Sequence, residues 1–258
     1  MKKSFLSVLI VLAVLIVVVV MGVGFFLDSI VKRGVETVGP KITQVSIKVD
    51  AVNLSLLNGS AKVKGLVVGN PEGYKTPQAI SISSADVGVN PLSVFSDKIV
   101  LRSVLIEAAD ITYEGGFGGN NLSKIMNNVN AIAQNDGPAA TNTPAKAASE
   151  PGRKFEVDDL LISGARVHVS LTGTGGKELT LPLPDIHLSD LGKDRAGITT
   201  TELTYRVLGA ITTAAVKTAA NATTGVGKGV GNWGKDVGKA AGQDVNKIAK
   251  GIGGLFKK

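Results

Sequence analysis

Cysteine is absent from the 258 residues, and histidine occurs only twice, at His168 and His187. Without a thiol, the chain can form neither a disulfide nor a thiolate metal site. Two imidazoles in separate strand-like stretches cannot build a metal site or a proton relay without help from carboxylates. No serine has the setting of an activated nucleophile, and no other catalytic constellation is present. We therefore expect a protein that is not an enzyme and that holds no metal and no cofactor.

Aromatic residues are also scarce, at 4% of the chain, while the net charge is +7. Proteins that bind single-stranded nucleic acid interleave basic side chains with stacking aromatic ones, and that pattern is missing. Much of the excess charge falls in residues 225–258, which contain seven lysines and two aspartates. On a chain that also carries a long apolar run, a basic tail indicates an anionic lipid surface as its partner, and no nucleic acid.

Charge is missing altogether from Ser4 to Leu27, a run of 24 residues that follows two lysines. A helix of that length is roughly 36 Å long, enough for a hydrocarbon core of ~30 Å. We expect a transmembrane anchor whose helix covers residues 4–38 and ends at Gly39-Pro40. The alternative is a cleaved signal peptide, but its apolar stretch is usually ~7–15 residues long and precedes a cleavage site of small residues.

Positive charges are nearly balanced on the two sides of this run, so the very short N-terminal tail decides the orientation. We expect the N-terminus to stay in the cytoplasm and residues 30–258 to lie on the other side of the membrane.

Beyond the anchor, the apolar pattern changes to a period of two, which is typical of half-buried strands. Residues 41–134 are expected to form a β module with a hairpin at Asn58-Gly59 and a short amphipathic helix at its end. Residues 135–152 have the composition of a flexible linker, and 153–190 continue an antiparallel sheet. The spacing Thr199-x-x-Glu202 opens a helix over 199–221. The expected fold class is mainly β with flanking helices.

The last segment, 225–258, hides a helical period among its glycines and lysines. We expect an amphipathic helix that forms on a membrane surface or on the protein's own sheet, because the many glycines disfavour a free helix. A disordered solubilising tail is the alternative. The candidate membrane-facing residues of this stripe are Val230, Trp233, Val237, Val245, Ile248 and Ile252.

Four segments between Val45 and Asn130 are distinctive: 54–59 (LSLLNG), 65–74 (GLVVGNPEGY), 90–100 (NPLSVFSDKIV) and 111–114 (ITYE). In these segments the stretch resembles the N-terminal module of the AsmA-like family of bacterial envelope proteins, and the apolar run before it is similar to the family's layout. The resemblance implies an inner-membrane protein with a single span, whose body is a curved, groove-like β-sheet in the periplasm with an apolar concave side. It offers no catalytic residues, and it connects the chain to bridge-like proteins associated with phospholipid movement.

Two functions follow from this resemblance and from the alternating strands. The first is contact with phospholipid through an apolar groove, in envelope or outer-membrane homeostasis. The second is a membrane-tethered scaffold whose sheet is closed by its own helix residues Leu203, Val207 and Ile211 and by the stripe of the tail. The sequence names no protein partner. The candidate lipid-facing residues are Val45, Ile47, Val49, Ile99 and Leu101.

Overall fold

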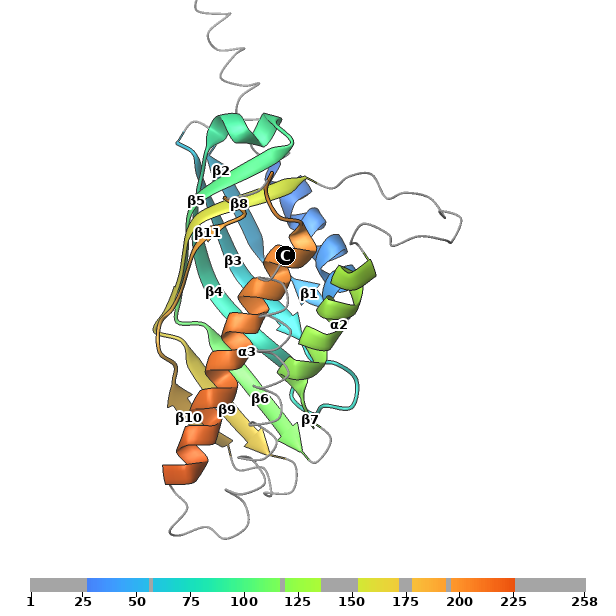
Figure 1. Ribbon diagram of the computed structural model, residues 1–258, viewed down its shortest axis with the longest axis vertical. Helices are drawn as coiled ribbons and strands as arrows, with labels where there is room; N and C mark the ends of the chain where they lie inside the picture. The colour runs from blue at the N-terminus through green and yellow to red at the C-terminus, as the bar shows by residue number, and fades with distance from the viewer. Residues whose placement is uncertain are drawn as a thin grey trace, which may run out of the picture.

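The computed structural model describes residues 27–55, 58–116, 119–135, 153–171, 178–193 and 196–225. These residues form mainly β-structure with a few helices, and the strands build one open, curled sheet (Figure 1). Within the described ranges, no helix is long and apolar enough to cross a membrane. The predicted transmembrane run, the linker 135–152 and the tail 225–258 lie outside these ranges, apart from residues at their margins.

The described chain begins with a helix over residues 27–43, here called the N-terminal helix. A 3₁₀ turn, η1, interrupts the first group of strands, helix α2 separates the two groups, and helix α3 follows the second. The bounds are β1 Ile47–Lys48, β2 Ala51–Ser55, β3 Ser60–Gly69, β4 Gln78–Val89, η1 Pro91–Phe95, β5 Lys98–Glu107, β6 Asp110–Gly116, β7 Gly119–Asn120, α2 Asn121–Asn135, β8 Lys154–Ser163, β9 Arg166–Leu171, β10 Glu178–Pro182, β11 Ile186–Leu191 and α3 Thr200–Gly225.

Several short strands are successive parts of longer ones, because they continue one register. β5 and β6 both run antiparallel to β4, with Ser84 opposite Glu107 and Ser81 opposite Asp110. β8 and β9 follow β5 and β6 at one constant offset. In the same way, β1 and β2 both pair with β3, while β11 and β10 pair with β8 and β9. The sheet therefore consists of long strands in the order β1/β2, β3, β4, β5/β6, β8/β9 and β11/β10, with β7 beside β6.

The prediction of a wholly antiparallel sheet is wrong at one boundary, where β5 runs parallel to β8 and β6 runs parallel to β9. The physical reason is the connection between them. After β6 the chain passes through β7 and helix α2, and a crossover that contains a helix returns the next strand in the same direction. The sheet is therefore mixed, and its parallel contact joins the expected module 41–134 to its continuation 153–190.

The N-terminal helix does not end at Gly39-Pro40 as predicted but continues to residue 43. Its last turn is intact, since Thr43 Oγ1 donates to Gly39 O and Gln44 N donates to Pro40 O, both at 2.9 Å. The glycine serves packing instead of termination, because a Cβ at this position would lie 2.6 Å from Ile47 Cδ1 of β1. A residue without a side chain lets the helix approach the strand closely.

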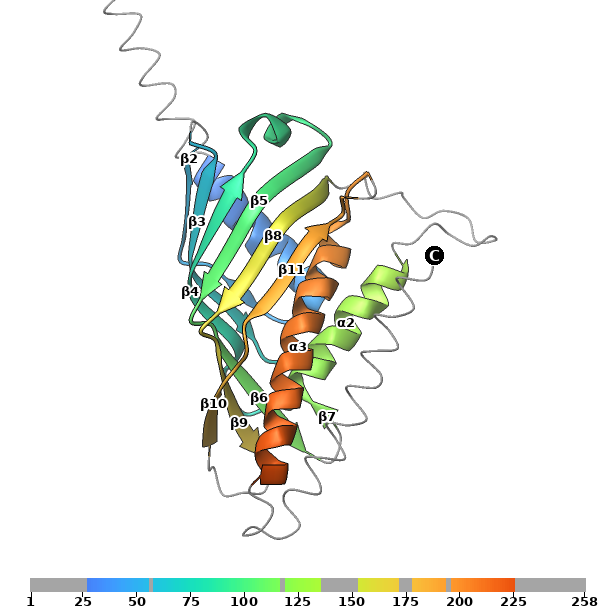
Figure 2. The same ribbon diagram turned by 60° about the vertical axis from the view of Figure 1, so that its left-hand side comes forward.

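A bend crosses the long strands at one level. It falls at Gly65 within β3, at Ala108 between β5 and β6, and at Gly164 between β8 and β9, and these residues have φ of 60°, 51° and 60°. A residue in this left-handed conformation acts as a bulge that turns the strand and increases its twist. Figure 2 shows β5, β8 and β11 on one side of the bend and β6, β9 and β10 on the other. We call these two parts the β5 half and the β6 half.

The bend keeps one face of the sheet apolar along its whole length. Side chains that face the core are two residues apart within each half, as strand alternation requires. Across the bend they are three apart, from Ile106 to Ala109 and from Ile162 to Ala165, and all four are buried. Without the extra residue at the bend, the apolar side chains beyond it would point to the opposite face of the sheet. The extra residue keeps them on the same face as the apolar side chains before the bend.

Candidate lipid-contacting surfaces

In the β6 half, helices α2 and α3 cover the apolar face and pack beside each other (Figures 1 and 2). Ile111 of β6 and Val167 of β9 are fully buried, as are Val129 of α2 and Val216 of α3. These residues belong to one continuous cluster of buried apolar side chains. This half of the face is therefore an ordinary hydrophobic core with no room for a ligand.

Helix α3 supplies the residues that were expected to close the sheet. Thr199 caps its start as the capping-box spacing predicted, since Glu202 N donates to Thr199 Oγ1 at 3.1 Å. The Glu202 carboxylate accepts from Arg206 Nη2 at 2.6 Å. Ile211 is buried in the core, and Leu203 and Val207 are half-buried against it. The strands on which α3 packs are β6, β8, β9 and β11. The helix thus covers the apolar face over β8 and β11 in the β5 half and over β6 and β9 in the β6 half.

Cover is less complete on β4 and β5 in the β5 half. Val87, Ile99, Leu101 and Val104 are all half-buried, although Leu101 and Val104 still contact the edge of the core cluster. Neither strand is among those on which α2 or α3 chiefly packs. Partly exposed aliphatic side chains that neighbour one another on one face form a surface that can take up apolar groups. We call Val87, Ile99, Leu101 and Val104 the open patch.

The five residues predicted to face lipid lie on two sides of the bend. Val45 and Val49 are buried, and Ile47 is half-buried opposite Val68, in a row that belongs to the β6 half. Ile99 and Leu101 lie on β5, beyond the bend, and are half-buried. The structure thus brings Ile99 and Leu101 together in the open patch and separates them from the other three.

The N-terminal helix seals the edge of the sheet formed by β1 and β2. Leu54 N donates to Asp28 Oδ1 at 2.7 Å, and Val49 N donates to Glu36 Oε1 at 3.0 Å. Lys32 Nζ donates to Asp50 O at 3.1 Å. These side chains satisfy backbone groups that would otherwise offer an edge for another strand. The contact between Asp28 and Leu54 also places the start of the helix at the end of the sheet where β2 and β3 form their hairpin.

The segments 65–74 and 111–114 form one polar network at the opposite end of the sheet. Glu114 is buried and accepts hydrogen bonds from Lys75 N at 2.7 Å, from Thr76 N at 2.8 Å and from Thr76 Oγ1 at 2.6 Å. Asn121 Nδ2 donates to Asn70 Oδ1 at 2.7 Å, which joins the start of α2 to the same loop. These segments, which carried the resemblance at sequence level, therefore hold the β3–β4 loop against β6 and α2.

Two opposing influences act on the pKa of Glu114. Burial is the largest and raises the pKa, because it disfavours the charged carboxylate. The hydrogen bonds from Thr76 and Lys75 stabilise the charged form and together outweigh it, so the pKa lies below its ordinary value. Glu114 is thus a charged structural anchor for a loop.

The opposite face of the sheet is polar and carries both histidines. His168 lies between two carboxylates, with Nε2 3.0 Å from Asp110 Oδ1 and Nδ1 2.9 Å from Glu178 Oε1. His187 is paired with Asp159. The hydrogen bond with His168 is the main influence that lowers the pKa of Asp110, and it acts with Arg166 against the effect of burial. Among the described residues, no group of histidine and carboxylate side chains is arranged to hold a metal ion.

A cavity of about 460 Å³ opens on this polar face, around Gly88. Its lining mixes backbone and aliphatic groups with two carboxylates, Asp86 and Asp159. Both carboxylates already have a partner, since Lys62 Nζ lies 3.0 Å from Asp86 Oδ1 and His187 pairs with Asp159. The lining residues are Ser60, Ala61, Asp86, Val87, Gly88, Ser103, Val104, Leu105, Asp159 and Leu161.

Sequence reasoning assigned no role to the apolar side chains of the η1 turn, which lie within the segment 90–100. Leu92 and Phe95 are each 81% exposed. The signal was present in the spacing, because residues three apart lie on the same side of a 3₁₀ turn. Two large apolar residues at that spacing, in a turn that begins with Asn-Pro, indicate an apolar point on the surface.

Together these features define the class of protein: a mainly β protein built on one curled mixed sheet, with helices over part of its apolar face and a helix that seals one edge. The model of the AsmA family matches residues 1–177, and the chain belongs to this family of envelope-associated proteins. No curated protein and no solved structure matches the chain.

Proposed function

We propose that this AsmA-family protein is a non-enzymatic, single-pass protein of the bacterial inner membrane that binds phospholipid acyl chains on the open patch. The Ser4–Leu27 run is the membrane anchor, with the N-terminus in the cytoplasm and residues 30–258 in the periplasm. Its role is contact with, or handling of, phospholipid in envelope or outer-membrane homeostasis.

The observation that carries the proposal is the incomplete cover of β4 and β5. Val87, Ile99, Leu101 and Val104 are half-buried on the same face of the sheet whose other parts are closed by α2 and α3. A protein that needed this face only for its own stability would gain by covering it, since burial contributes about 25 cal/mol per Å² of apolar surface. Acyl chains supply that cover without a polar partner.

The basic tail adds a second contact with the membrane in this proposal. Its stripe of Val230, Trp233, Val237, Val245, Ile248 and Ile252 lies beyond the described residues. The lysines of 225–258 favour an anionic lipid surface, where each contributes about 1 kcal/mol near the membrane.

A scaffold role is the second candidate, and one observation favours it. Ile211 is buried, and Leu203 and Val207 lie against the core, so α3 closes much of the face by itself. On this alternative, the open patch is the loosely packed margin of the core, and the protein positions other envelope components without carrying lipid.

The experiment that separates the two is quantitative mass spectrometry of lipids that copurify with the detergent-extracted full-length protein. Leu101→Asp should lower the amount of bound phospholipid, because an ionised carboxylate on the open patch repels acyl chains. Leu105→Asp is the matched control. Leu105 lies on the same strand and is also half-buried, but it pairs with Asp86 on the polar face.

Lipid that surrounds the anchor should be the same in all three proteins, so only the difference between the two variants counts. Retention of equal lipid by wild type and Leu101→Asp, with circular dichroism unchanged, would favour the scaffold. Loss of lipid in both variants would show that the effect is not specific to the apolar face.

A further inference from the structure

The η1 turn presents two large apolar side chains to solvent at one end of the sheet. Leu92 and Phe95 are each 81% exposed, whereas Ser93 between them is buried. Other large apolar side chains that are exposed in the described residues reach at most 51%, at Ile30. An apolar point of this kind is costly in water unless it has a partner.

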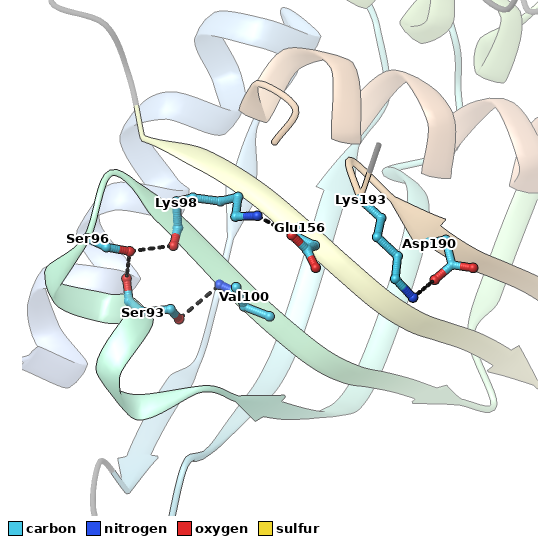
Figure 3. Close-up of polar contacts among 7 residues, drawn as sticks. All are labelled: Ser93, Ser96, Lys98, Val100, Glu156, Asp190 and Lys193. Carbon is cyan, nitrogen blue, oxygen red and sulfur yellow. Dashed lines mark hydrogen bonds and ion pairs between the residues drawn. The ribbon is translucent and has the colours of Figure 1, made fainter. Parts of the chain in front are cut away.

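The turn is held rigidly, so the exposure of these side chains is not the result of a loose loop. Val100 N donates to Ser93 Oγ at 2.9 Å, and Ser96 Oγ donates to Lys98 O at 2.7 Å (Figure 3). Asn90 Oδ1 accepts from Leu92 N at 3.2 Å and caps the start of the turn. The polar groups are thus used on the inner side of the turn, and the apolar side chains point away from it.

The turn lies at the end of the sheet where the N-terminal helix begins. η1 directly follows β4, and Val89 N donates to Gly59 O in the β2–β3 hairpin at 2.8 Å. The same hairpin end of β2 is bound to the N-terminal helix, because Leu54 N donates to Asp28 Oδ1. Ile30, which is 51% exposed, lies in the first described turn of that helix. The uncharged run to Leu27 therefore leaves the body at the end that carries Leu92 and Phe95.

A basic side chain, Arg153, stands at the base of the turn. Arg153 Nη1 donates to Val94 O at 2.9 Å, and within the described residues it has no carboxylate partner. Lys98 is paired with Glu156, and Lys193 with Asp190, on the neighbouring strands (Figure 3). With the apolar tip in the acyl region of a bilayer, the Arg153 guanidinium at the base of the turn would lie at the level of the lipid phosphate groups.

We propose that η1 is a further membrane contact, separate from the anchor and the tail, which inserts Leu92 and Phe95 into the periplasmic leaflet of the bilayer that holds the anchor while Arg153 meets lipid phosphates. The inference rests on the proposed anchoring, since the anchor brings this end of the sheet to the membrane. This contact would fix the orientation of the protein, with the long strands extending away from the bilayer and the open patch near the bilayer surface. Lipid could then pass between the bilayer and the open patch.

The test uses the full-length protein reconstituted in bilayers of phosphatidylethanolamine and phosphatidylglycerol. Trp233→Phe removes the single native tryptophan, and Phe95→Trp then reports on the turn alone. With lipids brominated near the headgroup, the emission of this tryptophan should be strongly quenched and shifted to the blue. The matched control is Leu179→Trp, an exposed apolar position on β10 at the far end of the sheet (Figure 1). Its emission should be unchanged by the brominated lipid.

A further variant separates insertion from mere closeness. Leu92→Asp in the Phe95→Trp protein should reduce the quenching severalfold, because burying a second apolar side chain is worth about tenfold or more in partition. Quenching of neither reporter, or equal quenching of both, in protein that remains in the bilayer after alkaline washing would overturn the inference and leave the anchor intact. Loss of the protein from the bilayer on that washing would overturn the anchoring itself.

Discussion

On the β6 side of the bend, Ile111 and Val167 are fully buried, whereas on the β5 side Ile99, Leu101 and Val104 remain half-buried. Ile111 and Leu101 lie on the same long strand and point to the same face of the sheet. Strand alternation is therefore not the cause of the difference. The cause is the position of α2 and α3, which cover β6 and β9 but pack less on the parts of β4 and β5 that lie in the β5 half.

The two halves of the sheet therefore differ in role: one stabilises the fold, and the other leaves apolar surface available for binding. The β6 half has the complete packing of a domain core, so it is expected to supply most of the folding free energy. The β5 half keeps the same apolar face but leaves part of it accessible. A protein that contacts lipid needs both: one region that keeps the sheet folded, and another in which apolar side chains remain free to exchange partners.

Substitution by aspartate on each side of the bend should give the largest contrast. Ile111→Asp is expected to destabilise the protein by several kcal/mol, because a carboxylate at a fully buried position has no water and no partner. Leu101→Asp should cost clearly less, since its side chain already reaches solvent. Urea unfolding followed by circular dichroism measures both. Equal losses would show that the two halves form one uniform core.

Substitution of Glu114 measures how much its hydrogen bonds to the β3–β4 loop stabilise the β6 half. Glu114→Gln replaces an acceptor oxygen by an amino group that faces N–H donors of the β3–β4 loop, with an expected cost of about 1–3 kcal/mol at neutral pH. Glu107→Gln is the control, because that carboxylate is exposed on β5. A similar cost in both variants would mean that the network is not special.

The difference in free energy of unfolding between wild type and Glu114→Gln should depend on pH with a definite sign. The folded pKa of Glu114 is lowered, so its contribution is fully present above the unfolded value of about 4.3. It is lost as pH falls through the folded pKa, because the carboxyl then binds a proton in both states. The stability gap between wild type and Glu114→Gln should therefore narrow below about pH 4. A gap that widens on acidification would contradict the assigned role.

Much of the local structure could be predicted from the sequence. The period of two located the β module 41–134, which contains β4, β5 and β6, and the capping spacing at Thr199 located the start of α3. Strand direction was missed, although the helix and linker between β6 and β8 are the connection that parallel strands require. The segments 98–114 and 154–170 also form an internal repeat, which the structure places side by side in parallel register. That similarity in the sequence would have indicated the parallel pair.

The candidate surface was only partly predictable. Ile99 and Leu101 could be assigned to an apolar face from their period, but their exposure depends on where α3 packs, which no local pattern encodes. The bend was hidden for a different reason: its signal is one step of three within a period of two, as at Ile106 and Ala109. In one strand alone, a spacing of three looks like an irregular pattern. It indicates a bend only when neighbouring strands have the same spacing of three at the positions that pair with it.

The bend itself can be tested with two opposite substitutions at equivalent positions. Gly164→Ala should destabilise by about 1 kcal/mol through its positive φ alone, because the nearest atom to an added Cβ is Ala108 N at 3.9 Å. Ala108→Gly should raise the free energy of unfolding by up to about 1 kcal/mol, since glycine relieves the same conformation.

Thermal unfolding of both variants gives the signs. Gly34→Ala is a control for the glycine-to-alanine change itself. Gly34 lies in the N-terminal helix with open space around it, so alanine at this position should stabilise the protein by roughly 1 kcal/mol. Stabilisation by Gly164→Ala would mean that the bend can straighten, and the two halves would then not be separated by a fixed feature of the backbone.

The smallest effect is expected on the polar face of the β6 half, at Asp110, the residue next to Ile111. Asp110→Asn removes the charge that faces His168 and Arg166, but the side chain is 38% exposed and solvent screens the pair. We expect a loss of less than about 1 kcal/mol at neutral pH, reduced further by salt. The lowered pKa of Asp110 means that this loss disappears as pH falls below the ordinary value of about 3.9. Urea unfolding at several pH values and salt concentrations measures it. A loss as large as that of Ile111→Asp, one residue away on the opposite face, would place the stability of this half in its polar surface and not in the core under α2 and α3.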